Sequence, residues 1–182
     1  MRSVRGLLVG RFQPFHLGHL GVVRAIRAER PDAPLLLGIG SAEQAYTWKD
    51  PFTAGERFDM AVRALEEAGL RGVEVVPVAD IQRHALWVSY LESLLPPFDR
   101  VYTNNPLTRY LFERAGYDVV RPRLIERRRF EGANVREHLA ADRGWKELVP
   151  PAVARYLATV GGPARLKLLR EGEGRSSGGR FR

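Results

Sequence analysis

GLLVGRFQPFHLGHLGVVRAIRAER, residues 6–30, is the stretch that decides the fold. It opens with a short, continuous apolar run at 6–10, which is typical of a strand buried on both faces. The next segment, 16–30, places Val22, Val23 and Ile26 on one helical face, with Leu20 at its edge. The stretch therefore predicts a buried strand followed by an amphipathic helix.

The same alternation continues along the chain. Further buried strands are predicted at 34–40, 73–80, 100–103 and 118–122, with helices at 51–70, 84–95 and 106–116 between them and at 132–141 and 150–160 after them. Thr53 and Glu56 match a capping box, and Asn105 with Pro106 has the pattern of an N-cap and a first helical residue. Because parallel neighbours need crossover helices, this order predicts an α/β fold with a parallel five-stranded sheet and helices on both faces.

Length and composition limit the class of protein. The chain has 182 residues, of which 45% are apolar and 27% charged, so we expect one globular domain over 1–170 and a disordered tail at 171–182. The absence of cysteine excludes disulfides, thiolate nucleophiles and cysteine-based metal sites. The longest apolar run is far shorter than the roughly 20 residues that span a bilayer, so we expect a cytoplasmic protein with no membrane partner.

The net charge of +8 comes almost entirely from arginine. The arginine guanidinium suits bidentate contacts to phosphate oxygens, so an anionic partner is expected. For any single arginine, a solvated surface position is an equally good explanation.

Two histidines stand three residues apart where the first helix begins. In GRFQPFHLGHL, residues 10–20, the side chains of His16 and His19 fall on the same side of a helical turn, and Gly18 between them lets a ligand approach the backbone. Such imidazoles can donate hydrogen bonds to phosphate, or offset its charge if they are protonated, at a helix N-terminus that itself favours anions. The alternative is that both histidines serve as helix caps or surface polar residues.

Two common phosphate-binding motifs are absent from the sequence. The loop at 10–19 lacks the Lys and Ser or Thr of GxxxxGK[ST], and GIGSAE at 38–43 has Glu43 where GxGxxG requires its third glycine. In an open α/β sheet, ligands bind at the carboxyl ends of the strands, so the loops after each strand remain the candidate site.

GRFQPFHLGHL resembles the HxGH signature of the nucleotidylyltransferase superfamily, and in its full form that of the archaeal-type nicotinamide-nucleotide adenylyltransferases. GIGSAE, DPFTAGER, WVSYLESLLPPFD, NNPL and RFEGANVR follow in the family's order, so the resemblance covers about residues 5–169. It implies a Rossmann-like fold that transfers the adenylyl group of ATP to nicotinamide mononucleotide, giving NAD and pyrophosphate with Mg²⁺. It also implies a homo-oligomer, the hexamer of that family.

The resemblance also assigns roles to individual residues. It makes His16, His19 and Arg136 the catalytic residues. The implied contacts to ATP and phosphate are Gly10, Arg11, Phe12, His16, Gly18, His19, Lys49, Gly132 and Arg136. The implied contacts to the mononucleotide and the adenine side are Ser41, Asp80, His84, Trp87, Asn104 and Asn105. Here Trp87 stacks on the nicotinamide ring, and Asp80, His84 and Trp87 share one face if 80–87 is helical.

Ordinary structural roles compete with several of these assignments. Lys49 can be a solvated loop residue, Ser41 a turn cap and Trp87 a core residue. Asn105 can simply cap the next helix. Arg136 can be an ordinary residue of a first helical turn, where its charge opposes the helix dipole.

The chain departs from the family pattern at two places. His84 stands where the family commonly has Asn, and Glu131 and Ala133 replace the hydroxyl residues that flank Gly132. Glu131 would repel phosphate unless it turns away or faces the metal. Rival functions are adenylyl transfer to flavin mononucleotide or phosphopantetheine, and a basic nucleic-acid-binding domain. The last leaves the histidine pair unexplained, so no nucleic-acid partner is expected.

Overall fold

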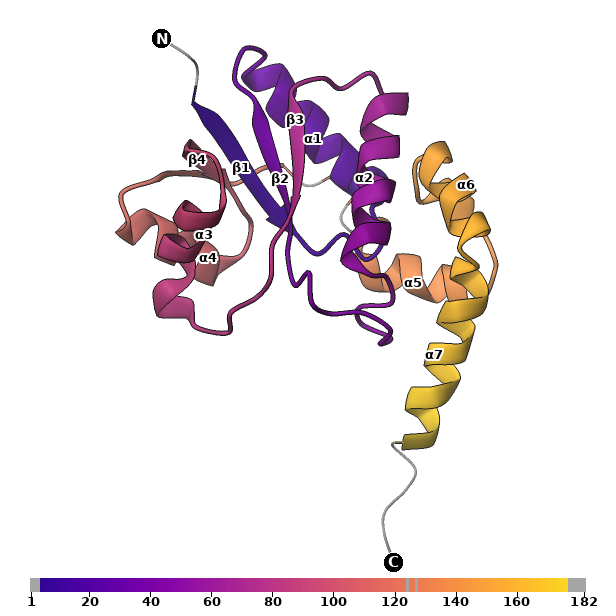
Figure 1. Ribbon diagram of the computed structural model, residues 1–182. Helices are drawn as coiled ribbons and strands as arrows, with labels where there is room; N and C mark the ends of the chain where they lie inside the picture. Colours follow the sequence, from indigo (N-terminus) through magenta and orange to yellow (C-terminus); the bar gives the residue numbers. More distant parts are fainter. Residues whose placement is uncertain (1–3, 124, 127, 177–182) are drawn as a thin grey trace, which may run out of the picture.

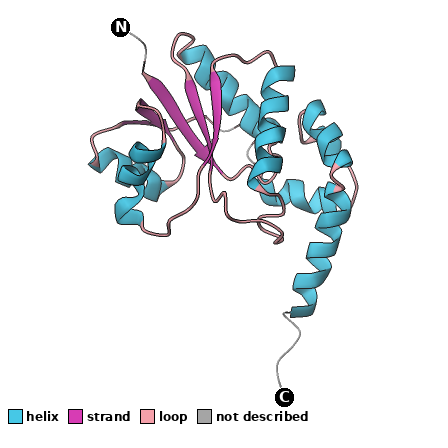
Figure 2. Ribbon diagram, in the orientation of Figure 1, coloured by secondary structure: helices cyan, strands magenta, loops and turns pink. Residues whose placement is uncertain are grey.

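The computed structural model describes residues 4–123, 125–126 and 128–176. Five parallel strands form one sheet in the order β3-β2-β1-β4-β5, which confirms the predicted α/β architecture (Figure 2). The strands are β1 (Arg5–Gly10), β2 (Leu35–Ile39), β3 (Val73–Pro77), β4 (Phe98–Tyr102) and β5 (Asp118–Val120). The chain first adds strands on one side of β1 and then crosses to the other side to add β4 and β5.

Helices connect the strands and extend the chain beyond the sheet. They are α1 (Leu17–Glu29), α2 (Ala54–Glu67), α3 (Trp87–Leu94), α4 (Pro106–Arg114), α5 (Gly132–Ala140), α6 (Pro151–Thr159) and α7 (Gly162–Ser176), with 3-10 turns at His84–Leu86 and Trp145–Glu147. In Figure 1, α1 and α2 lie on one side of the sheet and α3 and α4 on the other, while α5, α6 and α7 lie beyond α2. Helix α7 packs against α5 and α6.

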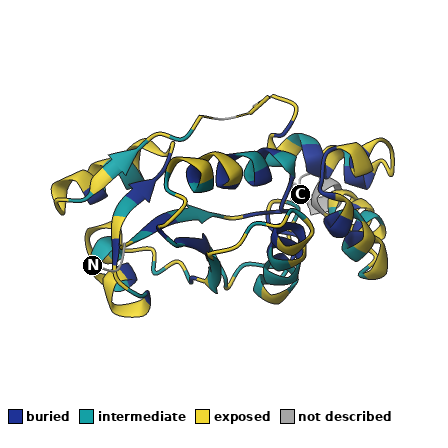
Figure 3. Cartoon of the chain, turned by 90° about the horizontal axis from the view of Figure 1, so that it is seen from above, coloured by how far each residue is buried: buried dark blue, intermediate teal, exposed yellow. Residues whose placement is uncertain are grey.

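Two hydrophobic cores follow from this layering. Because side chains alternate along a strand, Leu36 and Val101 face the α3–α4 side, where they pack with Leu91 and Phe112. The larger core lies under α1 and α2, and Phe15 is buried there. Figure 3 shows the buried stretches between the helices and the sheet and the exposed stretches on the outer helix surfaces. The strands are therefore covered on both faces, as predicted.

Local sequence signals set the helix starts. The Thr53 side chain accepts a hydrogen bond from the Glu56 amide while the Glu56 carboxylate accepts one from the Thr53 amide, so the predicted capping box is confirmed. The Asn105 side chain accepts from the Thr108 amide 3.0 Å away, and Pro106 begins α4 as predicted. Such caps satisfy amides that have no partner within the helix.

The structure corrects the sequence prediction in two segments. The predicted helix at 84–95 begins as the 3-10 turn His84–Leu86 and becomes α-helical only at Trp87. The predicted disordered tail is wrong for 171–176, because α7 continues to Ser176. Once Leu166 is buried against the core, each further residue extends an existing helix without a new nucleation cost. The rest of that tail, 177–182, lies outside the described residues. Among the helices that the structure describes, none is long and apolar enough to cross a membrane.

Candidate functional site

A cleft of about 310 Å³ opens at the carboxyl ends of β1, β2 and β4, where the direction of strand addition reverses. This is the position at which open α/β sheets bind ligands. Seven of the candidate residues line the cleft: Gly10, Arg11, Ser41, Asp80, His84, Trp87 and Asn105. The sheet topology thus brings together residues as far apart in the sequence as Gly10 and Asn105.

His16 and His19 close the start of α1 by capping each other's backbone. The Nδ1 atom of His16 accepts from the His19 amide at 3.3 Å, and the Nδ1 atom of His19 accepts from the His16 amide at 3.2 Å. The two rings stack with their centroids 3.4 Å apart and their planes 17° apart. The two histidines therefore do cap the helix, which was the alternative considered from the sequence, and the same hydrogen bonds fix the orientation of both rings.

This geometry determines where the protons sit. A neutral imidazole whose Nδ1 accepts a hydrogen bond carries its proton on Nε2, so both rings present an Nε2–H donor away from the backbone. Burial lowers the pKa of His16 to about 3, and the charge of Arg136 adds to the effect. Burial also lowers the pKa of His19 well below its ordinary value, as does His16 beside it. At neutral pH the pair therefore consists of two neutral donors rather than two cations.

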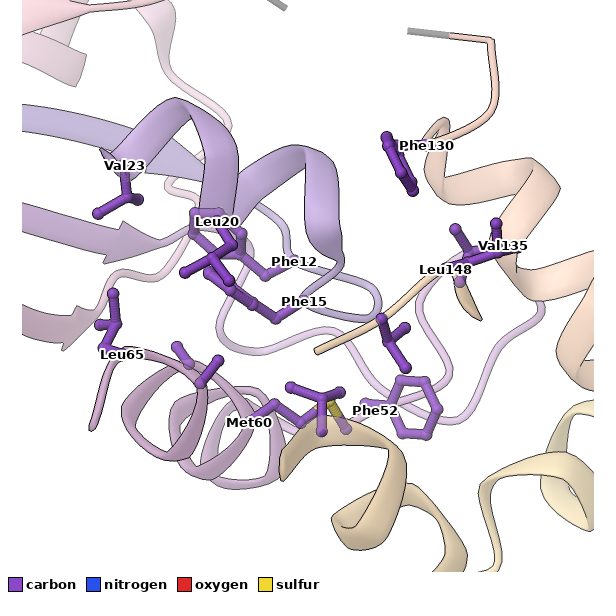
Figure 4. Close-up of a cluster of buried hydrophobic side chains, with 14 of the residues drawn as sticks. Phe12, Phe15, Leu20, Val23, Phe52, Met60, Leu65, Phe130, Val135 and Leu148 are labelled. Atoms are coloured by element: carbon purple, nitrogen blue, oxygen red, sulfur yellow. The ribbon is translucent and has the colours of Figure 1, made fainter. Parts of the chain in front are cut away.

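Aromatic packing holds the histidine pair from below. The Phe12 ring is buried, lies edge-on to the His19 ring at 4.8 Å and sits under Gly10, where an added Cβ would lie 2.8 Å from a ring atom. Figure 4 shows Phe12 and Phe15 beneath the first turns of α1 and Phe130 across from them, near the start of α5. The Phe12 side chain supports His19 from within the core, so a contact from Phe12 to a nucleotide would come from its backbone.

Gly18 is required for packing rather than for ligand access alone. It is buried, and a Cβ at this position would lie 2.8 Å from the Phe130 Cβ and 3.1 Å from the His16 Nδ1. The missing side chain lets the segment before α5 pack directly against the histidine pair. The structure thus gives Gly18 a physical role that the sequence pattern did not reveal.

Arg136 lies on α5 next to the histidine pair. Its side chain is buried, one Nη atom donates to the Gln13 carbonyl at 3.1 Å, and its Nε has no hydrogen-bond partner. An added Cβ at Gly132 would lie 3.3 Å from that Nη, so the glycine makes room for the guanidinium. Burial lowers the pKa of Arg136, with the nearby charge of Arg11 acting in the same direction. The buried Nε of Arg136 is left without a hydrogen-bond partner in the protein, and such a donor favours a bound anion.

Glu131, which departs from the family pattern, has an exposed side chain. Glu131 precedes α5 at its N-cap position, and its side chain makes no capping hydrogen bond there. Ala133 is exposed as well. The N-cap position of α5 therefore provides no side-chain cap for the amides of the first turn.

A second, polar hollow continues from the cleft along the loop between β2 and α2. Arg11, Ser41 and Asp80 line both, and Lys49 and Asp50 line only the hollow. Arg11 pairs with the buried Asp50 carboxylate at 3.3 Å. Lys49 is exposed, as a phosphate-binding residue at the rim or a solvated loop residue would be.

Asp80, His84 and Trp87 all line the cleft, but they do not share one helix. The Asp80 carboxylate accepts from the Gln82 amide at 2.8 Å, which forms a turn, and Gln82 adopts a left-handed φ of 52°. The condition for a shared helical face, a helix over 80–87, is therefore not met, because the turn comes before the 3-10 segment His84–Leu86. The loop instead brings all three side chains to the same wall of the cleft. Trp87 is half-buried and keeps part of its ring available.

The two asparagines after β4 separate in space. Asn105 lines the cleft while capping α4, and Asn104 donates to the Pro122 carbonyl at 3.0 Å without lining it. Asn104 thus fastens the loop after β4 to the segment after β5.

Arg57 was missed by the sequence reasoning. Its guanidinium is fully buried in α2 and donates to the carbonyls of Arg11 at 2.9 Å, Gly40 at 2.8 Å and Ser41 at 3.0 Å. Further bonds reach the Thr53 and Gln44 carbonyls. This side chain therefore joins the ends of β1 and β2. The only sequence signal was an arginine on the buried face of an amphipathic helix.

The fold and the cleft define a nucleotide-binding α/β protein with a histidine pair at its first helix. The cytidylyltransferase-like family model matches residues 7–149, and the chain belongs to this family.

Full-length relatives narrow the class further. A nicotinamide-nucleotide adenylyltransferase of Picrophilus torridus is 45% identical over 93% of this chain and 99% of its own length. One of Methanospirillum hungatei is 41% identical over 94% of this chain and 97% of its own. Within the family, the chain belongs to the nicotinamide-nucleotide adenylyltransferases.

Solved structures agree on the fold. A bifunctional NMN adenylyltransferase/ADP ribose pyrophosphatase from Francisella tularensis superposes with a TM-score of 0.68 at 19% identity over 95% of this chain. The same enzyme complexed with AMP and a Mn ion superposes with a TM-score of 0.65 at 20% identity over 93% of this chain. The chain spans about half of that bifunctional protein, 54% and 52% of its length in the two structures.

Proposed function

We propose that this chain transfers the adenylyl group of ATP to nicotinamide mononucleotide at the carboxyl edge of its sheet, and that His16, His19 and Arg136 hold the phosphates. The observation that carries the proposal is the stacked imidazole pair beside the buried Arg136, on the segment that follows Gly10 and Arg11 at the edge of the cleft. The pair supplies two fixed N–H donors at one point, and the cleft supplies an aromatic wall for a planar ring.

The chemistry needs only positioning and charge stabilisation. A phosphate oxygen of the mononucleotide attacks the α-phosphorus of ATP in line and forms a new P–O bond. The bond from the α-phosphorus to its bridging oxygen breaks, and pyrophosphate leaves with the electron pair. Because the nucleophile is already an anion, no general base is required. Fixed donors aimed at the oxygens that gain charge lower the barrier without reorganising during the reaction.

Each group of residues has a distinct part in this proposal. The Nε2–H groups of His16 and His19, with Arg136, bind the triphosphate. Arg11 and Lys49 bind the phosphates at the mouth of the cleft. The cleft wall of Asp80, His84 and Trp87 holds the nicotinamide, with Trp87 stacked on its ring. Ser41, Asn104 and Asn105 complete the contacts, and the backbones of Gly10, Phe12, Gly18 and Gly132 allow close approach of phosphate.

We further propose that Mg²⁺ enters as part of the ATP complex. Among the residues that the structure describes, no group of three or more His, Cys, Asp or Glu side chains could hold a metal ion. Mg²⁺ is typically held by substrate phosphates and water, with few protein ligands. The Mn ion in the Francisella structure supports the use of a divalent metal. The metal neutralises phosphate charge, and the protein's own donors fix the phosphate positions.

Product analysis tests the proposed activity. The protein is incubated with Mg-ATP and, in separate reactions, nicotinamide mononucleotide, flavin mononucleotide or phosphopantetheine, and dinucleotide and pyrophosphate are measured. We expect NAD and pyrophosphate in equal amounts. Product from another acceptor but not from the nicotinamide nucleotide would overturn the proposal. The cytoplasmic location and the hexamer stay predictions, and light scattering of the purified protein tests the latter.

Two variants separate catalysis from capping. His16→Asn keeps a side-chain oxygen that can cap α1 but loses the Nε2–H donor. We expect near-normal thermal stability with kcat reduced by about 10²–10³-fold, the usual effect of losing one such donor. His19→Ala should lower kcat much more than it changes KM for the mononucleotide, because its contact strengthens as pyrophosphate leaves. Unchanged kcat in both variants would remove the pair from the mechanism.

A further inference from the structure

The loop between β2 and α2 lines the polar hollow without regular secondary structure of its own. Its position depends on side-chain contacts from other parts of the fold. On the inner side, the Gln13 amide group exchanges two 3.0 Å hydrogen bonds with the Phe52 backbone, and Arg11 pairs with Asp50. These contacts come from the segment after β1. The outer side of the loop contacts α7.

Arg165 of α7 holds that outer side. One of its Nη atoms donates to the Pro51 carbonyl at 3.2 Å. Its guanidinium carbon lies 5.2 Å from the centroid of the Tyr46 ring and 5.5 Å from that of Phe52. Tyr46 adopts a left-handed φ of 58°, which non-glycine residues rarely adopt and which persists only where the surroundings support it. The contacts of Arg165 thus bracket Lys49 on both sides.

Glu56 fixes the Arg165 guanidinium itself. The two side chains form a two-pronged pair with both distances at 2.7 Å, and both are largely buried. The same carboxylate caps α2 by accepting from the Thr53 amide at 2.9 Å. Burial alone would raise the pKa of Glu56, but the hydrogen bonds from Arg165 and Thr53 outweigh it and hold the pKa below its usual value. The pair is therefore charged at neutral pH, and it links the start of α2, the loop and α7.

We infer that Arg165 is a positioning residue for the loop between β2 and α2. It holds Tyr46 and Pro51 so that Lys49 and Asp50 face the polar hollow. The inference rests on the proposed function, in which Arg11 and Lys49 of that hollow bind nucleotide phosphates. Helix α7 begins after residue 149, where the family match ends. A helix outside the nucleotide-binding sheet thereby controls the shape of the substrate site.

A second ion pair, between α2 and α6, offers the control. Arg155 pairs with Glu67 at 2.7 Å, and Glu67 also accepts from the Ala152 amide at 2.8 Å. This pair ties α6 to the far end of α2 with the same chemistry, an arginine and a helix-start amide sharing one carboxylate. It makes no contact with the loop. Arg155→Met therefore measures the effect of loosening the C-terminal helices alone.

The experiment compares Arg165→Met, Arg165→Lys and Arg155→Met with the unaltered protein. We measure kcat, KM for each substrate, and amide hydrogen exchange over residues 42–52. We expect Arg165→Met to raise KM for at least one of the two nucleotides about tenfold while kcat changes little, and to speed exchange in the loop. Arg165→Lys keeps the positive charge but loses the two-pronged hydrogen bonding of the guanidinium, so its KM and loop exchange should lie between those of Arg165→Met and the unaltered protein. Arg155→Met should alter neither KM nor loop exchange.

Each outcome decides the inference. If Arg165→Met lowers thermal stability but leaves loop exchange and KM as in Arg155→Met, Arg165 only ties helices together and the inference is wrong. If Arg165→Met does not fold, the same comparison is made with Arg165→Lys. If the unaltered protein makes no NAD, the proposed function fails, and loop exchange still tests whether Arg165 positions the loop.

Discussion

Replacing Gly18 by alanine should disturb the histidine pair through a single methyl group. The added Cβ would lie 2.8 Å from the Phe130 Cβ, an atom fixed to the backbone that cannot rotate away, and 3.1 Å from the His16 Nδ1. Either Phe130 or the His16 ring must therefore move. The substitution tests directly whether the packing described for this turn controls the site.

A second glycine in an equivalent position provides the reference. Gly18 and Gly55 are both the second residue of their helices, and both lie inside a capping box. A Cβ at Gly55 meets nothing within 4 Å. Both alanine variants gain up to about 1 kcal/mol of helix propensity, so this gain cancels between them. The difference is the overpacking at Gly18, about 1–3 kcal/mol, or a Tm difference of roughly 2–12 °C for a chain of this size.

Urea unfolding and initial-rate kinetics measure the two effects. Gly55→Ala should be as stable as the unaltered protein or more so, with unchanged kcat. Gly18→Ala should be less stable than Gly55→Ala by the stated amount, and its kcat should fall about tenfold as the His16 ring is displaced. Equal unfolding free energies for the two variants, together with equal kcat, would refute the packing argument.

Three further predictions concern other parts of the site. Because the pKa of His16 falls from 6.5 when unfolded to about 3 when folded, and that of His19 also falls, the unfolded chain binds more protons below pH 6.5. Stability should be full above pH 6.5 and fall as the pH drops, by up to about 1.4 kcal/mol per pH unit for each histidine, measured as Tm against pH. Arg57→Lys should leave carbonyls of the strand-end loops unpaired, lowering stability by about 2–4 kcal/mol in urea unfolding and raising KM for the mononucleotide. Trp87→Ala should raise KM for the mononucleotide roughly ten- to a hundredfold, from about 1–3 kcal/mol of lost stacking, with KM for ATP nearly unchanged.

Each of these predictions has its own control. In His16→Asn the dependence of Tm on pH should become shallower, and an unchanged slope would contradict the pKa argument. Arg27 donates to the carbonyls of Arg30, Pro31 and Ala33 at the opposite end of the sheet, so Arg27→Lys should cost stability without changing KM. For Trp87, equal increases in KM for both substrates would show that the ring supports the fold rather than the nicotinamide.

The fold could be predicted from the sequence because its signals are local and agree with one another. Short apolar runs alternate with amphipathic segments, and the Thr53 and Asn105 caps mark helix starts without help from tertiary contacts. The prediction failed where a side chain interacts with nearby backbone. The Asp80 carboxylate folds a turn just before the predicted helix at 84–95, so 80–87 is not one helical segment, and nothing in the periodicity of that segment reveals it.

The residues of the candidate site could be predicted from the sequence, but the contacts that hold them in place could not. The histidine spacing predicted that both rings lie on one side of the turn, yet it could not show that each ring caps the other's backbone or that burial keeps both neutral. Arg57 and Arg165 act through contacts with carbonyls, rings and carboxylates from distant segments. Such contacts depend on packing between elements, which sequence spacing does not encode.

The mutual capping of the two histidines makes assembly of the donor pair and closure of one helical turn a single event. Each Nδ1 accepts a hydrogen bond from a main-chain amide, and this bond keeps the ring proton on Nε2. When the first turn of α1 frays, both bonds are lost and the proton of each imidazole is no longer fixed on Nε2. The imidazole nitrogens are therefore an internal reporter. Their ¹⁵N resonances, recorded on protein without nucleotide, would distinguish molecules ready for substrate from those that are folded everywhere except at this turn.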